Sequence, residues 1–197
     1  MPRVAGQIDP RKSEAILSSA AVLFAERGGA VTMEEIARHA GVSKQTLYNR
    51  FASKTEIARA LASRRSDAIT APLRSGGDTE AVLTAFAKAV LDKICSPAKG
   101  ESMRGVALLA PTAPDLAQAI YDGGPGESLR RLSAWLAEQD RLGLLSVPDP
   151  DIAAEMFTGM TLGHGHLRTF LGIAHPQRDH LARAREAARR FIRAFAV

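Results

Sequence analysis

The sequence predicts an all-α protein that begins with a three-helix, helix-turn-helix unit and continues into a second helical unit, with about nine helices in total. Three observations support this class. Alanine and leucine are frequent while runs of β-branched residues are absent. Apolar residues recur three and four positions apart along most of the chain. A chain of 197 residues is also long enough to bury a sizeable core in one or two domains.

The N-terminus predicts a loose arm followed by a first helix. Proline and glycine interrupt residues 1–10, and the basic side chains Arg3, Arg11 and Lys12 either reach a DNA groove or phosphates, or remain in a solvated tail. The first helix is expected from Pro10 to Arg27. Its apolar face packs against the helices that follow and consists of Ile16, Ala20, Leu23 and Phe24.

A second helix is predicted from Met33 to Ala40. Thr32 precedes it and Glu35 follows three residues later, which is the spacing of a capping box. Gly41 then ends the helix, because glycine adopts a left-handed backbone without a Cβ penalty.

A third helix is predicted from Lys44 to Arg50, capped by Ser43. Leu47 and Phe51 turn inward, so the intervening polar residues form an outer face. Glutamine and asparagine can pair bidentately with adenine, threonine can contact a base, and lysine and tyrosine can reach phosphates, all from a rod that fits the major groove. Many helical hairpins with a glycine turn bind nothing, so the motif alone does not decide the function.

The charge distribution agrees with a DNA-binding N-terminus. Residues 1–65 contain 11 Lys or Arg against six Asp or Glu, a balance of +5, whereas the rest of the chain holds 15 of each. The entire net charge therefore lies with the helix-turn-helix, as binding to phosphates requires. A generally basic composition would not produce this partition.

The segment Leu23–Ile57 resembles the DNA-binding domain of the TetR family of bacterial transcriptional regulators. The matching features, in order, are Leu23-Phe24, Gly28, Thr32, Ile36-Ala37, Ala40-Gly41-Val42-Ser43, Thr46-Leu47-Tyr48, Phe51 and Lys54. Gln45 departs from the glycine common in that family, so the operator sequence cannot be inferred from relatives. Arg104–Gly172 resembles the AefR-like subgroup. The resemblance implies a DNA-binding domain over 1–54, a linking helix over 55–74 and a helical effector-binding and dimerisation domain over 75–197.

Helical spacing, prolines and glycines divide the remainder. Residues 74–78 are a break, 96–101 a loop, and 123–126 a turn. Ser53 and Asp151 are expected to cap the helices that follow them. The expected helices are Lys54–Thr70, Thr79–Ile94, Ser102–Ala110, Pro114–Tyr121, Glu127–Leu142, Asp151–Leu171 and Pro176–Ala196.

Three groups of site residues follow from these patterns and from the resemblance. We expect DNA contacts from Thr32, Ser43, Lys44, Gln45, Thr46, Tyr48, Asn49 and Lys54. By analogy with the family, a pocket for a small, mostly apolar effector involves Phe86, Met103, Leu108, Tyr121, Trp135, Met160 and His164. The family's four-helix dimer interface implies Ile152, Met156, Phe157, Leu167, Leu181, Ala188, Phe191 and Phe195.

The sequence gives little indication of a metal site, a cofactor or catalysis. His164 and His166 point about 200° apart on a helix, so they do not share a metal ion, and we expect no metal, cofactor or catalytic residue. The single Cys95 is interpreted as a packing residue in a reducing cytoplasm, and no apolar run is long enough to span a membrane. The main hypothesis is a homodimeric repressor of a double-stranded DNA operator, released by a small molecule. The alternative is a DNA-binding helical dimer that needs no effector or answers to a protein partner.

Overall fold

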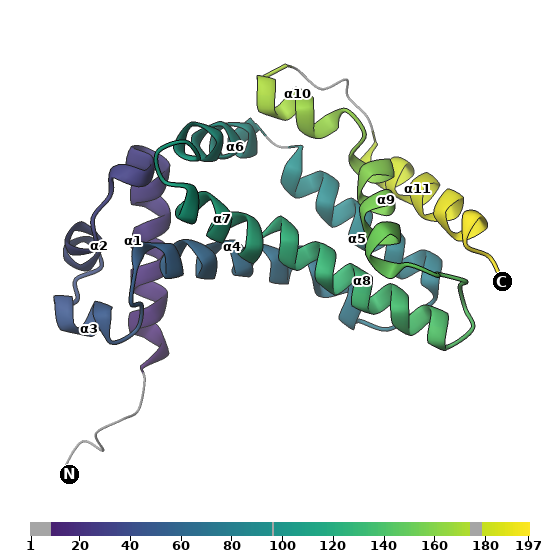
Figure 1. The fold of residues 1–197 in the computed structure, drawn as a ribbon, viewed down its shortest axis with the longest axis horizontal. Coiled ribbons are helices and arrows are strands. Elements are labelled where there is room, and N and C mark those ends of the chain that lie inside the picture. Colours follow the sequence, from purple (N-terminus) through teal and green to yellow (C-terminus); the bar gives the residue numbers. More distant parts are fainter. Residues whose placement is uncertain (1–8, 96, 174–178) are drawn as a thin grey trace, which may run out of the picture. The chain divides into compact units, whose positions relative to one another are not determined.

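The computed structural model describes residues 9–95, 97–173 and 179–197, leaving aside the side chains of 97–102. All regular structure in these residues is helical, which confirms the all-α class (Figure 1). None of the helices in them combines the length and apolar character needed to cross a membrane. The helices are α1 (Pro10–Arg27), η1 (Gly28–Ala30), α2 (Met33–His39), α3 (Lys44–Tyr48), α4 (Lys54–Thr70), η2 (Ala71–Arg74), α5 (Thr79–Ile94), α6 (Pro97–Leu109), α7 (Pro114–Gly123), α8 (Pro125–Arg141), α9 (Pro150–Leu162), α10 (Gly165–Leu171) and α11 (His180–Ala194).

The chain forms two compact units and contributes to the first of them twice. The N-terminal unit contains Met1–Leu61 and Gly105–Ile120, and the C-terminal unit contains Ala62–Arg104 and Tyr121–Val197. The boundaries fall within α4, α6 and α7. Contacts thus assign the end of α6 and most of α7 to the unit that carries the helix-turn-helix, an assignment that the sequence did not suggest.

The core of the N-terminal unit joins α1, α2 and α3. Most residues predicted to face inward are buried, and Phe24 is half-buried, because their three- and four-residue spacing places them on one face of each helix. Where the second segment of this unit returns, the Leu109 side chain lies directly on Gly29: a Cβ added at Gly29 would lie 2.2 Å from Leu109 Cδ1. The buried residues of this core are Ile16, Leu17, Ala20, Leu23, Val31, Met33, Ile36, Ala37, Leu47, Phe51 and Ile57.

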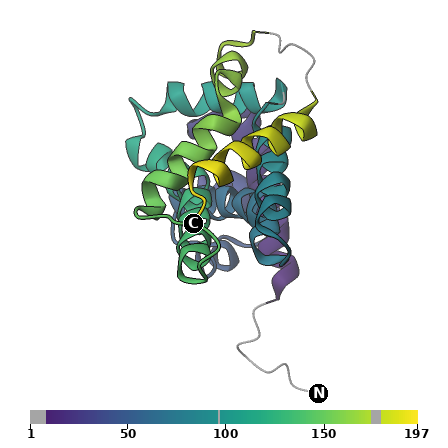
Figure 2. The same cartoon turned by 90° about the vertical axis from the view of Figure 1, so that its right-hand side faces the viewer.

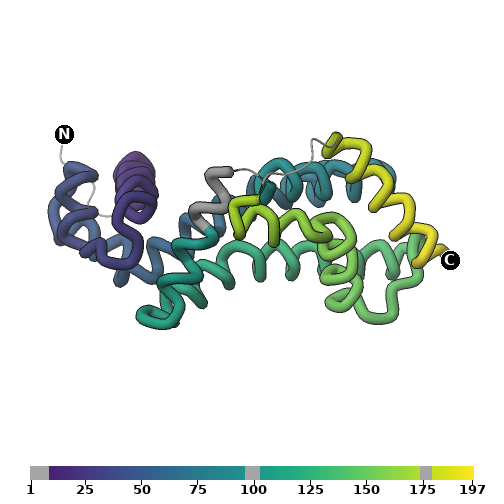
Figure 3. Tube along the Cα trace, turned by 90° about the horizontal axis from the view of Figure 1, so that it is seen from above, coloured from purple at the N-terminus to yellow at the C-terminus, as the bar shows by residue number. Residues whose placement is uncertain are grey.

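The C-terminal unit is a bundle in which α9 contacts α8, α11 and α5, and α11 packs along α5 (Figures 2 and 3). Aromatic rings connect these helices. The Phe157 ring centroid lies 6.2 Å from that of Phe86 and 5.0 Å from that of Phe191, and the centroids of Phe191 and Phe195 are 4.5 Å apart. Phe157 and Phe191 have no exposed surface. The centre of this unit is therefore aromatic, with α9 and α11 as its main contributors.

A polar cluster connects the C-terminal part of α4 to α8. The Arg131 guanidinium donates from Nη1 to Asp67 Oδ1 at 2.6 Å and to Thr70 Oγ1 at 2.9 Å, and from Nε to Glu127 Oε1 at 2.6 Å. Ser66 Oγ lies 2.7 Å from Ser128 Oγ on the same pair of helices. These bonds fix the register between the two helices.

Most predicted helix ends lie within two residues of the observed ones, and four differences stand out. The helix expected over Asp151–Leu171 is two helices, because Gly163 has a φ of 49° and ends α9. The cap of α9 is Asp149, which accepts from Ile152 N at 3.0 Å, rather than Asp151. Residues from Pro97 onward are helical and not a loop, with proline in the first turn. The third helix, α3, ends at Tyr48. The expected start of the last helix, Pro176, lies outside the described residues.

Candidate DNA-binding surface

The start of α2 is fixed by the predicted capping box. Thr32 Oγ1 accepts from Glu35 N at 3.3 Å and donates to Glu35 Oε2 at 3.0 Å, while that carboxylate oxygen accepts from Thr32 N at 2.9 Å. The other oxygen of Glu35 accepts from Arg27 Nη1 at 2.6 Å, which connects α2 to α1. The Thr32 hydroxyl therefore both donates and accepts within the protein, although its side chain is exposed.

These bonds also lower the pKa of Glu35. Hydrogen bonds from the Thr32 backbone, from Arg27 and from the Thr32 hydroxyl bring it to about 2, because they stabilise the charged carboxylate. The pKa of Glu34 is lowered by its backbone hydrogen bond and by Lys44. Both carboxylates of the first turn of α2 are thus ionised at neutral pH. Their negative charges interact favourably with the positive N-terminal end of the helix dipole.

The turn and the next cap present α3 to solvent. Gly41 has a φ of 64°, the left-handed backbone that the sequence predicted for this position. Ser43 Oγ accepts from Thr46 N at 3.1 Å and lies 2.8 Å from Thr46 Oγ1. Leu47 has no exposed surface and anchors α3 to the core. The orientation of α3 is therefore held at both its start and its buried face.

The outer face of α3 carries polar side chains. Lys44, Gln45 and Asn49 are exposed, Tyr48 is 46% exposed, and Thr46 is half-buried. The structure thus brings together the five residues expected from helical spacing. One neighbour was missed: Glu34 Oε1 lies 3.2 Å from Lys44 Nζ, across the turn. The ten-residue separation of this pair gives no signal in the sequence, because it depends on how the two helices cross.

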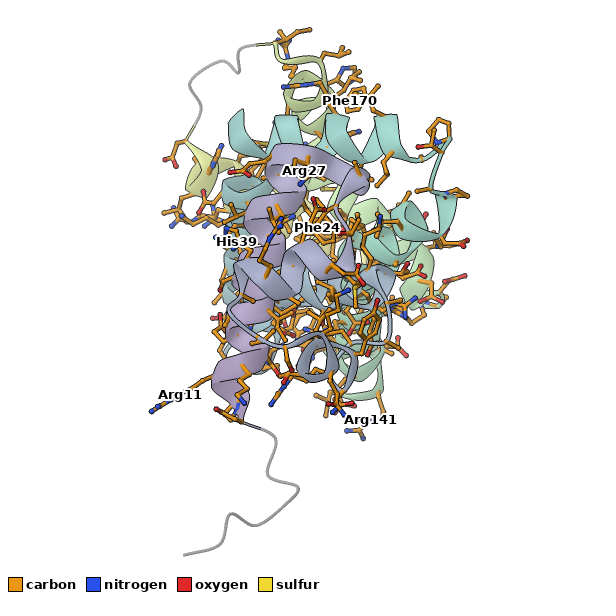
Figure 4. All side chains as sticks on the ribbon, turned by 90° about the vertical axis from the view of Figure 1, so that its left-hand side faces the viewer. Arg11, Phe24, Arg27, His39, Arg141 and Phe170 are labelled. Atoms are coloured by element: carbon orange, nitrogen blue, oxygen red, sulfur yellow. The ribbon has the colours of Figure 1, made fainter. Side chains whose placement is uncertain are left out.

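The basic residues around α3 divide into free and engaged groups. Lys54 is half-buried and its ammonium donates to the Gly29 carbonyl, so part of its hydrogen-bonding capacity stabilises the unit. Arg50 Nη1 donates to Ser13 Oγ at 2.6 Å. Arg11 extends from the start of α1 in Figure 4 and is exposed. Arg3 lies outside the described residues.

The residues expected around an effector do not form one group in the C-terminal unit. Phe86 and Trp135 belong to or pack against its core, and Met103 is half-buried. Tyr121, Met160 and His164 are exposed. Leu108 belongs to the N-terminal unit and is 80% exposed, so its assignment to a pocket is corrected: a side chain with that much solvent contact does not line an enclosed site.

The residues expected at a dimer interface also divide into two sets. Phe157, Ala188 and Phe191 have no exposed surface in the single chain, so they cannot contact a second chain, and we remove them from the interface. Phe195 is half-buried against the core. The remaining four are exposed apolar side chains: Ile152, Met156, Leu167 and Leu181. The periodicity of α9 and α11 did not separate the two sets because both helices carry apolar residues on more than one face.

Comparison with known proteins adds a family context to this surface. Residues 16–61 match the family model described as bacterial regulatory proteins, tetR family, and residues 81–197 match the C-terminal domain of AefR-like transcriptional repressors. Two curated relatives are from Mycobacterium tuberculosis. The repressor KstR2 is 50% identical over 58 residues, 29% of this chain and 28% of the relative, and the regulator AlkX is 32% identical over 123 residues, 59% and 55% of the two chains. This chain thus spans only part of each relative's length.

Solved structures resemble the whole chain. A transcriptional regulator from Mesorhizobium loti superposes with a TM-score of 0.76 at 24% identity, over 95% of this chain and 98% of the other. The flavonoid-responsive regulator FrrA superposes with a TM-score of 0.71 at 29% identity, over 94% and 97% of the two chains. The arrangement of helices described above is therefore shared along nearly the full length of these proteins.

Proposed function

This chain belongs to the TetR family of bacterial transcriptional regulators, and from that premise we propose that it is a homodimeric repressor, released from a two-fold symmetric operator by a small, mostly apolar molecule. The observation that carries the proposal is the exposed polar face of α3, held in a basic unit by its caps and by Leu47. A capped helix with such a face reads bases without first having to become ordered, which lowers the entropic cost of binding.

In the proposed complex α3 enters the major groove. The exposed amides of Gln45 and Asn49 are suited to adenine, because an amide N–H can donate to adenine N7 while the amide oxygen accepts from the adenine N6 amino group. Lys44 and Tyr48 contact phosphates. The ion pair between Lys44 and Glu34 does not prevent this, because both side chains are exposed and such pairs contribute only about 0 to 1 kcal/mol. Lys44 can therefore leave Glu34 and pair with a phosphate at a small cost in free energy.

Ser43, Thr32 and Lys54 serve the same interface in another way. Ser43 and Thr32 hold the starts of α3 and α2 through hydrogen bonds already made in the free protein, and their exposed side chains lie where a backbone phosphate can approach. Lys54 keeps two N–H groups besides the one on Gly29, because an ammonium has three donors. These residues position the recognition helix and do not choose the sequence.

Dimerisation is supported by an apolar stripe on α9. Ile152, Met156 and Met160 are 57%, 52% and 40% exposed, and their four-residue spacing aligns them on one face of the helix. Leu167 and Leu181 add exposed apolar surface in the same unit. Contiguous patches of this kind mark protein interfaces. Met160, expected in the effector pocket, is better placed in this stripe.

The two-fold axis of such a dimer sets a geometric requirement. Two recognition helices must be about 34 to 36 Å apart to enter successive major grooves on one side of the duplex. An effector releases the operator if it binds more tightly to a dimer with another spacing. FrrA is named for its response to flavonoids, and this supports a small-molecule effector here.

Selection from a random duplex pool at near-physiological salt tests the DNA part of the proposal. Recovery of a symmetric site would support specific binding by a dimer. The variant Gln45→Ala should relax base preference at one position of each half-site. Lys44→Ala, one residue away on the same exposed face, should weaken binding to all DNA sequences similarly. It should also reduce the slope of log binding constant against log salt concentration by about 1. If Gln45→Ala left base preference intact, the assigned role of this residue would be wrong.

The effector part is tested by thermal stabilisation with a metabolite panel. A ligand present at 100 times its dissociation constant adds about 2.7 kcal/mol to the free energy of unfolding. A compound that stabilises the protein and also releases the selected duplex is the expected result. If stabilising compounds leave the duplex bound, release by a small molecule is refuted and control by a protein partner becomes the better hypothesis.

A further inference from the structure

The last turn of α9 contains a buried hydroxyl group that makes no hydrogen bond. Thr161 is 1% exposed, and its Oγ1 has no partner among the described residues. Thr158, on the same helix, shows the usual behaviour: its Oγ1 donates to the Ala154 carbonyl at 2.9 Å. Buried hydroxyls without a partner are rare, because each loses its hydrogen bonds to water without replacement. The Thr161 hydroxyl is therefore a buried donor that no described residue satisfies.

A cation without a counterion reaches the same residue from α11. Arg183 is half-buried, and its Nε donates to the Thr161 carbonyl at 2.6 Å. Gly163 leaves room for it: a Cβ there would lie 2.7 Å from Arg183 Nη2. Among the described residues no carboxylate lies within ion-pair distance of this guanidinium. The end of α9 offsets only part of its charge, because a helix C-terminus carries about −0.5 of an elementary charge.

The nearby carboxylate of Asp92 already pairs with other side chains. Asp92 on α5 pairs with Lys88 at 2.5 Å and with His180 Nδ1 at 2.8 Å. Arg183 and Asp92 both act on the Cys95 thiol, whose pKa is raised mainly by burial. The guanidinium thus acts electrostatically on a partly buried thiol, while the carboxylate that acts on the same thiol is paired with other cations.

Apolar side chains surround the two polar groups. Phe157 lies one helical turn before Thr161 and is fully buried, and Leu162 and Cys95 pack against the same core. Figure 2 shows α9 and α11 side by side, the two helices that supply Thr161 and Arg183. A polar pair at the edge of an apolar core suits a molecule with one charged end.

We propose that Thr161 and Arg183 bind the head group of the effector, and that the effector is an apolar molecule ending in a carboxylate. The proposal rests on the function proposed above, since it names the chemical class of that effector. One carboxylate oxygen accepts from the Thr161 hydroxyl and the guanidinium of Arg183 donates to the carboxylate, while the apolar part packs against Leu162 and Cys95, the half-buried side chains at the edge of this core. Arginine suits this task because its planar fork of donors matches a carboxylate.

Melting temperatures with matched probes test this directly. The probes are hexanoate, octanoate, decanoate, dodecanoate and benzoate, each beside the corresponding alcohol, added to the full-length protein. We expect at least one carboxylate to raise the melting temperature by several degrees and its alcohol to do so much less. Titration should show Arg183→Gln removing the preference for the carboxylate, and Thr161→Val lowering its affinity about tenfold, the effect of one hydrogen bond to a charged group.

Two control variants separate ligand binding from folding. Arg185→Gln removes an exposed charge from the same helix, and Thr158→Val removes a hydroxyl that is already bonded. Neither should change the preference for carboxylates. Thr161→Val should raise the melting temperature of the ligand-free protein, because it removes an unpaired buried hydroxyl, whereas Thr158→Val should lower it. Thr161→Val therefore remains informative even if Arg183→Gln does not fold.

The outcomes are distinguishable from a failure of the proposed function. No stabilisation by any carboxylate, equal stabilisation by carboxylates and alcohols, or equal affinity in wild type and Arg183→Gln would each overturn the assignment of the head group. If a neutral compound then released the selected duplex, the repressor would stand with another class of effector. A failure to select any DNA sequence would instead refute the repressor function. The carboxylate measurements would still decide whether Thr161 and Arg183 bind a carboxylate.

Discussion

Replacing Phe157 by alanine should destabilise the folded C-terminal unit strongly, because this side chain lies at the centre of its aromatic core. Phe157 has no exposed surface, and its ring centroid lies 6.2 Å and 5.0 Å from those of Phe86 and Phe191. Truncation of a buried phenylalanine costs about 3 to 5 kcal/mol, from lost apolar burial and the cavity left behind. For a chain of this size that is a fall of about 6 to 20 °C in melting temperature.

The adjacent Met156 provides the matched control. It is 52% exposed, so Met156→Ala should change the stability of the folded monomer by no more than about 0.5 kcal/mol. The same change should weaken the proposed dimer. Urea unfolding and analytical ultracentrifugation at several protein concentrations separate the two effects, because only dimerisation makes stability depend on concentration. If Phe157→Ala weakened association and left unfolding unchanged, the inward orientation of this face of α9 would be wrong.

Two further changes have defined outcomes in the N-terminal unit. Because the pKa of Glu35 is about 2, below its usual value, its stabilising effect is complete above about pH 4.5 and disappears as the pH falls toward 2. Glu35→Gln should therefore flatten the fall in melting temperature across that window, and an unchanged profile would exclude the carboxylate bonds to Thr32 as its cause. Lys54→Met should lower the free energy of unfolding by about 1 kcal/mol through loss of the bond to Gly29. Lys44→Met should leave it nearly unchanged, so equal effects of the two lysine variants in urea would contradict the engaged state of Lys54.

Local signals in the sequence were sufficient for the helix-turn-helix. The capping box at Thr32, the left-handed Gly41 and the cap at Ser43 each depend on residues within a few positions, and the structure contains all three. Short-range rules work here because the helices are short and their ends carry most of the specifying chemistry.

Contacts between distant segments could not be predicted in the same way. Glu34 meets Lys44 because of the angle between two helices, and Arg131 meets Asp67 across 64 positions. The inner and outer faces of α9 were confused for a related reason. Phe157 and Met156 are neighbours in an apolar sequence, and only the packing of α8, α11 and α5 decides which of them is buried.

The N-terminal unit is built from two separate segments of the chain, and this determines which part of it forms last. Leu109 rests on Gly29, and Gly105–Ile120 belongs with Met1–Leu61, so part of this unit is synthesised after the whole of Ala62–Arg104, the first segment of the C-terminal unit. A ribosome releases the helix-turn-helix well before it releases Ile120. We therefore expect a nascent chain stopped near residue 74 to contain an incomplete N-terminal unit. Protection of α1 from proteases should increase only once α7 has emerged from the ribosome.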